Sequence, residues 1–139
     1  FKIAKRKGTY LLINTAASHK PEKWYNEAFD TFGPGEWIFG IDGLPNESHK
    51  YRINQDGEKL FEMAKLCAKK GITTRWQYII FKYNENHIEQ ARKMAEDNGI
   101  IFEISTSARF EGPDDPYRPT NPYHYIDPTQ FAFVRKLNV

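Results

Sequence analysis

The sequence predicts an α/β fold with a parallel sheet, because β-rich runs alternate along the chain with amphipathic helical segments. Gly8, Gly71 and Gly99 each end a polar helical stretch directly before a β-rich run, and glycine commonly terminates helices. Right-handed crossovers between such strands predict an open parallel sheet, with the four strands in chain order and the helices on one face. The expected strands are Thr9–Asn14, Glu36–Asp42, Ile72–Phe81 and Ile100–Ser105.

The strands TYLLIN and WQYIIF contain nearly continuous apolar segments, a pattern typical of strands that are covered on both faces. We expect a helix to begin at Pro21, because proline fits the first turn. Its buried side would carry Trp24, Ala28, Phe29 and Phe32.

Two further helices are expected between the later strands. One runs from about Asp56 to Lys70, with apolar side chains at three- and four-residue steps that include Cys67. The other starts near residues 84–86 and ends at Gly99, and Asn86 with Glu89 has the spacing of a capping box.

Composition limits the class of protein. The 139 residues are 40% hydrophobic and 27% charged, which favours a folded domain over a disordered chain, and no apolar run is long enough for a membrane span. The net charge of +2 is too balanced to favour binding to nucleic acid or to a membrane surface. The single cysteine, Cys67, allows no disulfide within the chain and no all-cysteine metal site, and we expect a cytoplasmic protein.

The two ends of the chain have distinct patterns. Phe1 leads directly into what resembles the last turns of a helix, so we expect the polypeptide to begin inside a larger fold. After the domain formed by residues 1–110, residues 111–139 are predicted to form a proline- and tyrosine-rich extended tail. Within this tail, Phe131–Val134 is expected to add a short strand or to dock on the core.

Polar residues that follow the strands are the candidate site, because ligands gather at the carboxyl ends of parallel strands. Asp42 follows an apolar strand and is suited to accept bonds from a ribose or an amine, or else simply to cap a turn with Gly43. Arg52 has a planar fork that suits a carboxylate or a phosphate, or else it belongs to a solvated loop. The four histidines lack metal-ligand spacing, so no metal site is predicted within the chain.

Three stretches together resemble one enzyme family. They are Ile41-Asp42-Gly43-Leu44, the motif His49-x-Tyr51-Arg52-x-Asn54, and the run from Trp76 to Glu85. In order and spacing they resemble the radical S-adenosylmethionine (radical SAM) enzymes, and most closely the subgroup with an auxiliary SPASM domain. Lys20-Pro21-Glu22 and Ala108-Arg109-Phe110 add to the resemblance, which covers roughly residues 1–110.

The resemblance implies a partial TIM-like barrel of the (β/α)6 type, of which this chain would supply the third to sixth strands. The three-cysteine loop for the 4Fe-4S cluster and the glycine-rich turn would precede this part. Four residues are implied to bind the cofactor: Asp42 lines the cavity, Arg52 approaches the cofactor carboxylate, Ile79 passes the adenine, and Asn84 lies at the mouth. Thr15-Ala16-Ala17 stands where the family often has Thr-Asn-Gly.

Family chemistry is the reductive cleavage of S-adenosylmethionine by a 4Fe-4S cluster, which yields a 5′-deoxyadenosyl radical that takes hydrogen from a substrate, often a peptide or protein side chain. The first hypothesis is therefore a fragment or split part of such an enzyme. It would be inactive alone and would need the missing N-terminal cluster-bearing segment or a partner chain. The second is a non-catalytic βα module that binds a nucleotide-like ligand or a protein partner, and the third is an unrelated α/β domain.

Overall fold

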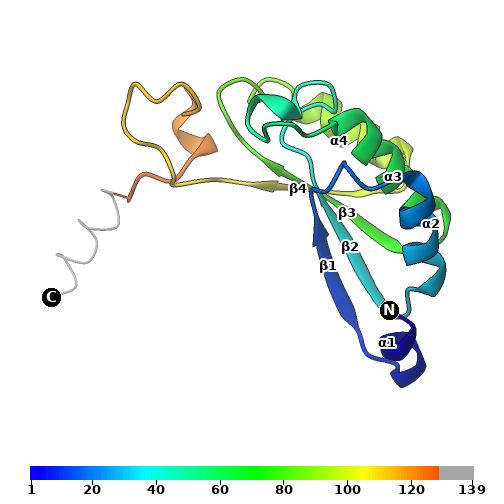
Figure 1. The fold of residues 1–139 in the computed structure, drawn as a ribbon. Coiled ribbons are helices and arrows are strands. Elements are labelled where there is room, and N and C mark those ends of the chain that lie inside the picture. The colour runs from blue at the N-terminus through cyan, green and yellow to red at the C-terminus, as the bar shows by residue number, and fades with distance from the viewer. Residues whose placement is uncertain (129–139) are drawn as a thin grey trace, which may run out of the picture.

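The computed structural model describes residues 1–128, and its elements alternate between helix and strand (Figure 1). In chain order the helices and strands are α1 (Lys2–Lys7), β1 (Leu11–Thr15), α2 (Glu22–Thr31), β2 (Gly35–Gly40), α3 (Gly57–Lys69), β3 (Thr73–Ile79), α4 (Ile88–Asp97) and β4 (Ile101–Ser105). Two short 3-10 helices, Ser48–Lys50 and Pro122–His124, lie in loops. Among the described residues, no helix has both the length and the apolar character of a membrane span.

The four strands form one sheet in the order β1-β2-β3-β4, and every neighbouring pair is parallel. This confirms the predicted α/β class and the predicted parallel pairing. Each strand pairs with the next one along the chain, so each connection crosses over by one helix. Figure 1 shows α2, α3 and α4 together on one side of the sheet.

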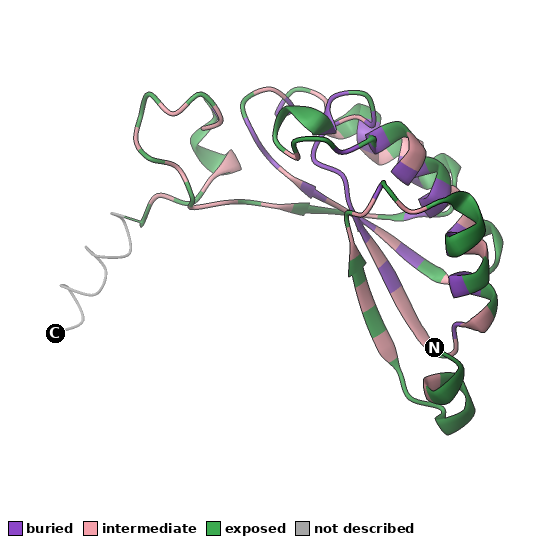
Figure 2. Ribbon diagram, in the orientation of Figure 1, coloured by how far each residue is buried: buried purple, intermediate pink, exposed green. Residues whose placement is uncertain are grey.

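Helices cover one face of the sheet and leave the other face uncovered. Trp37, Phe39, Trp76 and Tyr78 are buried beneath the helices. The opposite face, here called the open face, carries the alternate residues Leu12, Ile38, Gly40, Arg75 and Gln77. The predicted placement of the helices on one face is confirmed, whereas the cover of strands on both faces that the apolar runs suggested is wrong for the described residues. Leu12 is 61% exposed, and no residue of β1 is buried (Figure 2).

The buried side of α2 differs from the prediction by one residue. Trp24 is 40% exposed, whereas Tyr25 is fully buried. Pro21 is the N-cap and the helix begins at Glu22, and the other three predicted residues, Ala28, Phe29 and Phe32, are buried. The Tyr25 hydroxyl donates to the Ala17 carbonyl, so its polar end is satisfied inside the core. Trp24 instead lies at the surface.

The helix starts also test the sequence patterns. Helix α3 begins one residue after Asp56, close to the predicted start, and the Asp56 carboxylate caps it by accepting a bond from the Lys59 N–H at 3.0 Å. The predicted capping box of Asn86 with Glu89 is wrong, because α4 begins one residue after His87 and no side chain caps it. His87 directs its ring to Glu47 at 2.8 Å, which ties the helix start to the loop after β2.

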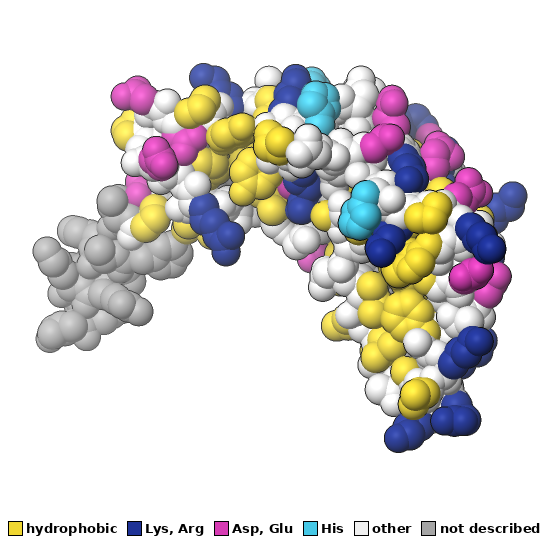
Figure 3. Space-filling view, viewed as in Figure 1, with side chains coloured by type: hydrophobic (Ala, Val, Ile, Leu, Met, Phe, Trp, Pro, Cys, Tyr) yellow, Lys and Arg dark blue, Asp and Glu magenta, His cyan; other side chains and the backbone are white. Residues whose placement is uncertain are grey.

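Residues outside the sheet complete the described chain. Helix α1 buries nothing, and Figure 3 shows lysine and arginine side chains gathered at its end of the molecule. After β4 the chain turns back, and Ser107 forms a parallel bridge with Tyr125. The Lys82 N–H donates to the Tyr117 carbonyl at 2.9 Å, which holds this segment beside the end of β3. The predicted strand at Phe131–Val134 lies outside the described residues.

Candidate functional site

Asp42 lies just beyond β2 and is completely buried. Its Oδ1 accepts a bond from the Ile79 N–H at 2.9 Å, and its Oδ2 accepts a bond from Arg52 Nε at 2.7 Å. The Tyr83 hydroxyl donates to the Asp42 carbonyl. Both carboxylate oxygens are thus engaged, and Asp42 links β2, β3 and the loop that carries Arg52.

The protonation of Asp42 reflects two opposing effects. Burial raises the pKa of its carboxyl above the usual range, because the carboxylate loses contact with water. The Arg52 charge and the Ile79 N–H act in the opposite direction and reduce the shift. Asp42 therefore acts as a structural acceptor that orients Arg52.

Arg52 folds back over the end of the sheet. It pairs with Asp42 and not with the two acids nearest to it along the chain, the buried Glu47 and the exposed Asp56, and its side chain remains 26% exposed. The guanidinium lies above Gly40, such that a Cβ built on Gly40 would come within 2.8 Å of Nη2. Asp42 and Arg52 therefore lie together at the end of the sheet, and the solvated-loop alternative for Arg52 does not hold.

A buried polar network holds the Arg52 loop in place. The Ser48 hydroxyl accepts from the Asp42 N–H at 2.9 Å and donates to Gln55 Oε1. Gln55 Nε2 donates in turn to the Gly40 carbonyl at 2.9 Å. Sequence reasoning missed Ser48 and Gln55 as positioning residues. Their types are common in exposed loops, and only the fold shows that this loop returns to β2.

Ile79 and Asn84 occupy different surroundings. Ile79 contributes its N–H to Asp42 and lies on the open face at the end of β3. Asn84 is fully buried, and its amide accepts from the Phe81 N–H at 2.8 Å and donates to the Ile79 carbonyl at 2.9 Å. Asn84 thus shapes the turn after β3, and it reaches the other three predicted site residues only through the main chain of Ile79.

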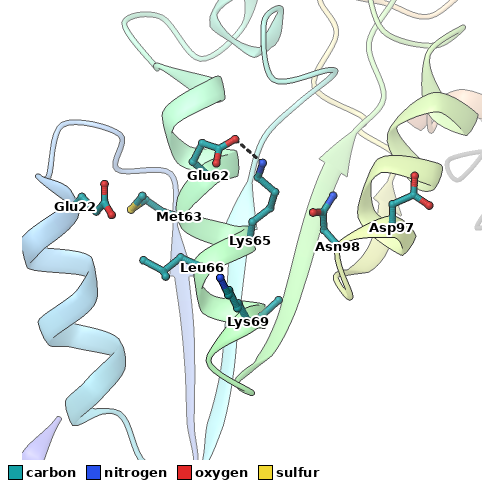
Figure 4. A pocket seen from close by; sticks show the side chains of 9 residues that line it. Glu22, Glu62, Met63, Lys65, Leu66, Lys69, Asp97 and Asn98 are labelled. Carbon is teal, nitrogen blue, oxygen red and sulfur yellow. Dashed lines mark ion pairs between the residues drawn. The ribbon is translucent and has the colours of Figure 1, made fainter.

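Two cavities on the surface differ in size and in their position relative to the sheet. A cavity of about 230 Å³ opens beside Arg52 at the carboxyl end of the sheet, lined by Asn14, Thr15, Ala16, Ile38, Gly40, Arg52 and Gln77. A larger groove of about 680 Å³ lies outside the sheet along α3, between α2 and α4 (Figure 4). Glu62 and Lys65 pair with each other there, and none of the four predicted site residues lines this groove.

Glu85 anchors the segment after β4. Its buried carboxylate accepts from the Thr120 N–H at 3.0 Å, the Thr120 hydroxyl and the Asn121 N–H at 3.2 Å. His124 Nδ1 lies 3.1 Å from the second oxygen. Burial opposes ionisation of Glu85, but these hydrogen bonds outweigh it and lower the pKa of the carboxyl. Sequence reasoning did not foresee this role of Glu85.

The described residues do not fit an iron–sulfur cluster. Such a cluster needs several thiolates, and the chain has one cysteine, which is buried in α3. Burial raises the pKa of the Cys67 thiol to about 11, which disfavours the thiolate. Residues 1–128 also contain no group of three or more histidine, cysteine or acidic side chains that could hold a metal ion.

Comparison with known proteins gives no relative: no family model, curated protein or solved structure matches the chain.

Proposed function

We propose that this chain is the C-terminal part of a partial TIM-like barrel of the radical SAM type, related to the SPASM-associated subgroup, and that it acts with a cluster-bearing segment or partner chain. The observation that carries the proposal is the sheet itself. Its four parallel strands follow chain order and have helices on one face alone. The wall of a barrel is built in this way. In a doubly wound sheet, by contrast, the strand order reverses at one point and helices cover both faces of the sheet.

The polar end of the sheet supports the same proposal. In a barrel, the open face would become the interior, and the ends of β2 and β3 would face the ligand. Arg52 is the residue suited to hold the cofactor carboxylate, Asp42 orients it, and Ile79 lines the wall beside them. Asn84 shapes the turn at the mouth. Bound with its cluster, S-adenosylmethionine would supply the chemistry that abstracts hydrogen from the substrate. The proposed substrate is a peptide or protein, and the proposed compartment is the reducing cytoplasm.

The experiment that tests this proposal is assembly with the missing part. The chain is produced alone and together with the coding segment that precedes it, and each sample is reconstituted anaerobically with iron and sulfide. We expect no stoichiometric cluster in the chain alone. In the assembly, with dithionite as the electron donor, we expect a cluster and the reductive cleavage of S-adenosylmethionine to methionine and a 5′-deoxyadenosyl radical, which becomes 5′-deoxyadenosine when it takes a hydrogen atom.

A pair of arginine variants makes the test specific to the site. Arg52→Ala should weaken cofactor binding to the assembly by about 1–3 kcal/mol, the usual cost of a lost charged hydrogen bond. Arg92→Ala is the control, because Arg92 lies on α4 and pairs with Glu89 at the surface. Equal affinity in both variants, or a coding region without a three-cysteine motif, would favour the non-catalytic module.

A further inference from the structure

Positive charge is concentrated at the end of the molecule that carries α1, here called the basic end (Figure 3). Helix α1 contains Lys2, Lys5, Arg6 and Lys7, and all four side chains are exposed. None of the four pairs with an acidic side chain among residues 1–128. The net charge of +2 averages over the whole chain and therefore does not reveal this basic end.

The acids of α2 that lie near α1 are already engaged by other lysines. Lys70, at the end of α3, lies 2.5 Å from Asp30 Oδ1, and Lys5 Nζ donates to the Asp30 carbonyl at 3.4 Å. Asp30 thus joins the end of α3 to α1 and adds a further lysine to the basic end. Glu27 lies 4.0 Å from Lys23. The cations of α1 therefore remain available to an anionic partner.

Two large apolar side chains lie exposed among these cations. Ile3 of α1 is 63% exposed, and Trp24 of α2 is 40% exposed. Both line a groove of about 680 Å³ between the two helices, which also carries Glu27. Lys20 Nζ lies 5.5 Å from the centre of the Trp24 ring. Exposed apolar side chains that are rimmed by charged residues commonly mark a surface that binds a protein or a membrane.

Helix α1 is held in place although it buries none of its own residues. The Phe1 ring, directly before the helix, packs edge-on against Phe32 and Trp37, with ring centres 5.5 and 5.7 Å apart. A Cβ built on Gly33 would lie 2.8 Å from Lys5 Cα, so the main chain of α1 lies directly against Gly33. The exposed side chains of α1 are therefore held in a fixed position beside the groove.

We propose that the basic end binds to a membrane surface that contains anionic lipids. Such a surface offers anionic headgroups to the cations of α1, and it offers Trp24 and Ile3 an apolar boundary below the headgroups. A nucleic acid would attract the cations but would give Ile3 no apolar surroundings.

Binding in this orientation would leave the candidate site accessible. Helix α1 precedes β1 and lies at the amino ends of the parallel strands, whereas Asp42 and Arg52 lie at their carboxyl ends (Figure 1). The inference does not depend on the proposed function, because it uses none of the residues assigned to the cofactor.

The test is co-sedimentation of the chain with lipid vesicles. Vesicles of phosphatidylcholine alone are compared with vesicles that also contain phosphatidylserine. We expect saturable binding to the anionic vesicles alone, and weaker binding as the salt concentration rises. The combined change of Lys5→Gln, Arg6→Gln and Lys7→Gln should weaken this binding about a hundredfold, because each cation near an anionic surface contributes a factor of about five.

A matched control removes the same amount of charge elsewhere. Lys50, Lys82 and Arg109 are exposed cations that follow the carboxyl ends of the strands. Their combined change to glutamine should leave vesicle binding close to that of the wild type. Equal losses in the two triple variants would overturn the proposal, because attraction by the overall charge would then explain the binding.

The fluorescence of Trp24 tests whether apolar side chains reach the lipid. Trp37 and Trp76 are buried, so Trp24 is the tryptophan that a membrane can contact. We expect anionic vesicles to shift its emission to shorter wavelength and brominated acyl chains to quench it, and we expect Ile3→Ser to weaken binding severalfold. Two further results overturn the proposal: no saturable binding to anionic vesicles, or unchanged Trp24 emission together with equally tight binding of single-stranded RNA.

Discussion

The Asp42 carboxylate replaces a main-chain acceptor for Ile79. The Ile41 N–H still donates to the Gln77 carbonyl at 3.2 Å, but the next N–H on β3 that faces β2 belongs to Ile79 and donates to Asp42 Oδ1 at 2.9 Å. The side chain therefore extends the ladder between β2 and β3 after the main chains have separated. This arrangement frees the chain after Asp42 to form the loop that returns Arg52 to the sheet.

Asp42→Ala should destabilise the fold by about 3 kcal/mol, because it leaves a buried N–H and a partly buried guanidinium without their acceptor. Asp42→Asn should cost less, because its amide oxygen can still accept from Ile79. Urea unfolding followed by tryptophan fluorescence measures both variants. Equal losses would show that the bond to Ile79 contributes little.

Because Asp42 is buried, the free energy of unfolding should decrease as pH rises and this carboxyl ionises. The pKa of this carboxyl is raised in the folded state, so the folded chain binds more protons than the unfolded chain between the two pKa values. Stability is therefore expected to fall as pH rises from about 4, the ordinary aspartate value, through the folded pKa. Asp42→Asn should remove this part of the slope in unfolding curves measured across that range.

Glu85→Gln should loosen the segment after β4 with little effect on the sheet, because its contacts are to Thr120, Asn121 and His124. Amide hydrogen exchange should rise in residues 115–125 and stay unchanged in β2 and β3. Glu111→Gln is the matched control, since Glu111 is an exposed acid of the same segment.

Acid should produce the same loosening in the wild-type protein. The pKa of Glu85 is lowered, so its contribution is present above the unfolded pKa and is lost as pH falls through the folded value. Exchange in the segment should therefore increase below about pH 4, near the ordinary glutamate value. An unchanged exchange rate in both acid and Glu85→Gln would show that other contacts hold the segment.

Cys67 should react with thiol reagents much more slowly in the folded protein than in urea. Its side chain is fully buried, so the reagent cannot easily reach the sulfur. Burial also raises the pKa of the thiol to about 11, so little of the reactive thiolate is present at neutral pH. A colorimetric thiol assay over time measures the rate. Reaction as fast as that of the unfolded chain would indicate that α3 opens frequently.

Gly57→Ala should destabilise the fold although alanine is the better helix former. The gain in helix propensity is about 1 kcal/mol. Against it, the new Cβ would lie 2.2 Å from the Pro45 carbonyl oxygen, a main-chain atom that cannot turn aside. The clash should exceed the propensity gain, which thermal unfolding would detect as a lower Tm. A higher Tm would show that the loop after β2 shifts at little cost.

Local patterns predicted the strands and their order because each glycine-ended helix and apolar run is encoded within a few residues. The cover of the sheet was harder to predict. An apolar run such as TYLLIN has the same composition whether one face or two faces are covered, and only the positions of the helices decide between them. The exchange of Trp24 for Tyr25 shows the same limit, because the helical period places both residues near the buried side and only the packing decides which one faces the sheet.

Within the candidate site, the sequence suggested Asp42 and Arg52 from their types and from the end of a strand. Their contact depends on the path of a loop, which no local pattern encodes. Ser48 helps to fix that path through Asp42 and Gln55, and Gln55 in turn donates to the carbonyls of Gly40 and Ala16, which are distant along the chain. Glu85 likewise gained its role from a segment more than thirty residues away.

The agreement between strand order and chain order bears on how the molecule is made. Each new strand finds its partner in the strand synthesised just before it, so no finished pair must open to admit a later one. As the chain leaves the ribosome, the sheet can grow by one helix and one strand at a time. The last strand to be added, β4, then remains at the free edge of the described sheet, where a further strand would continue the same growth.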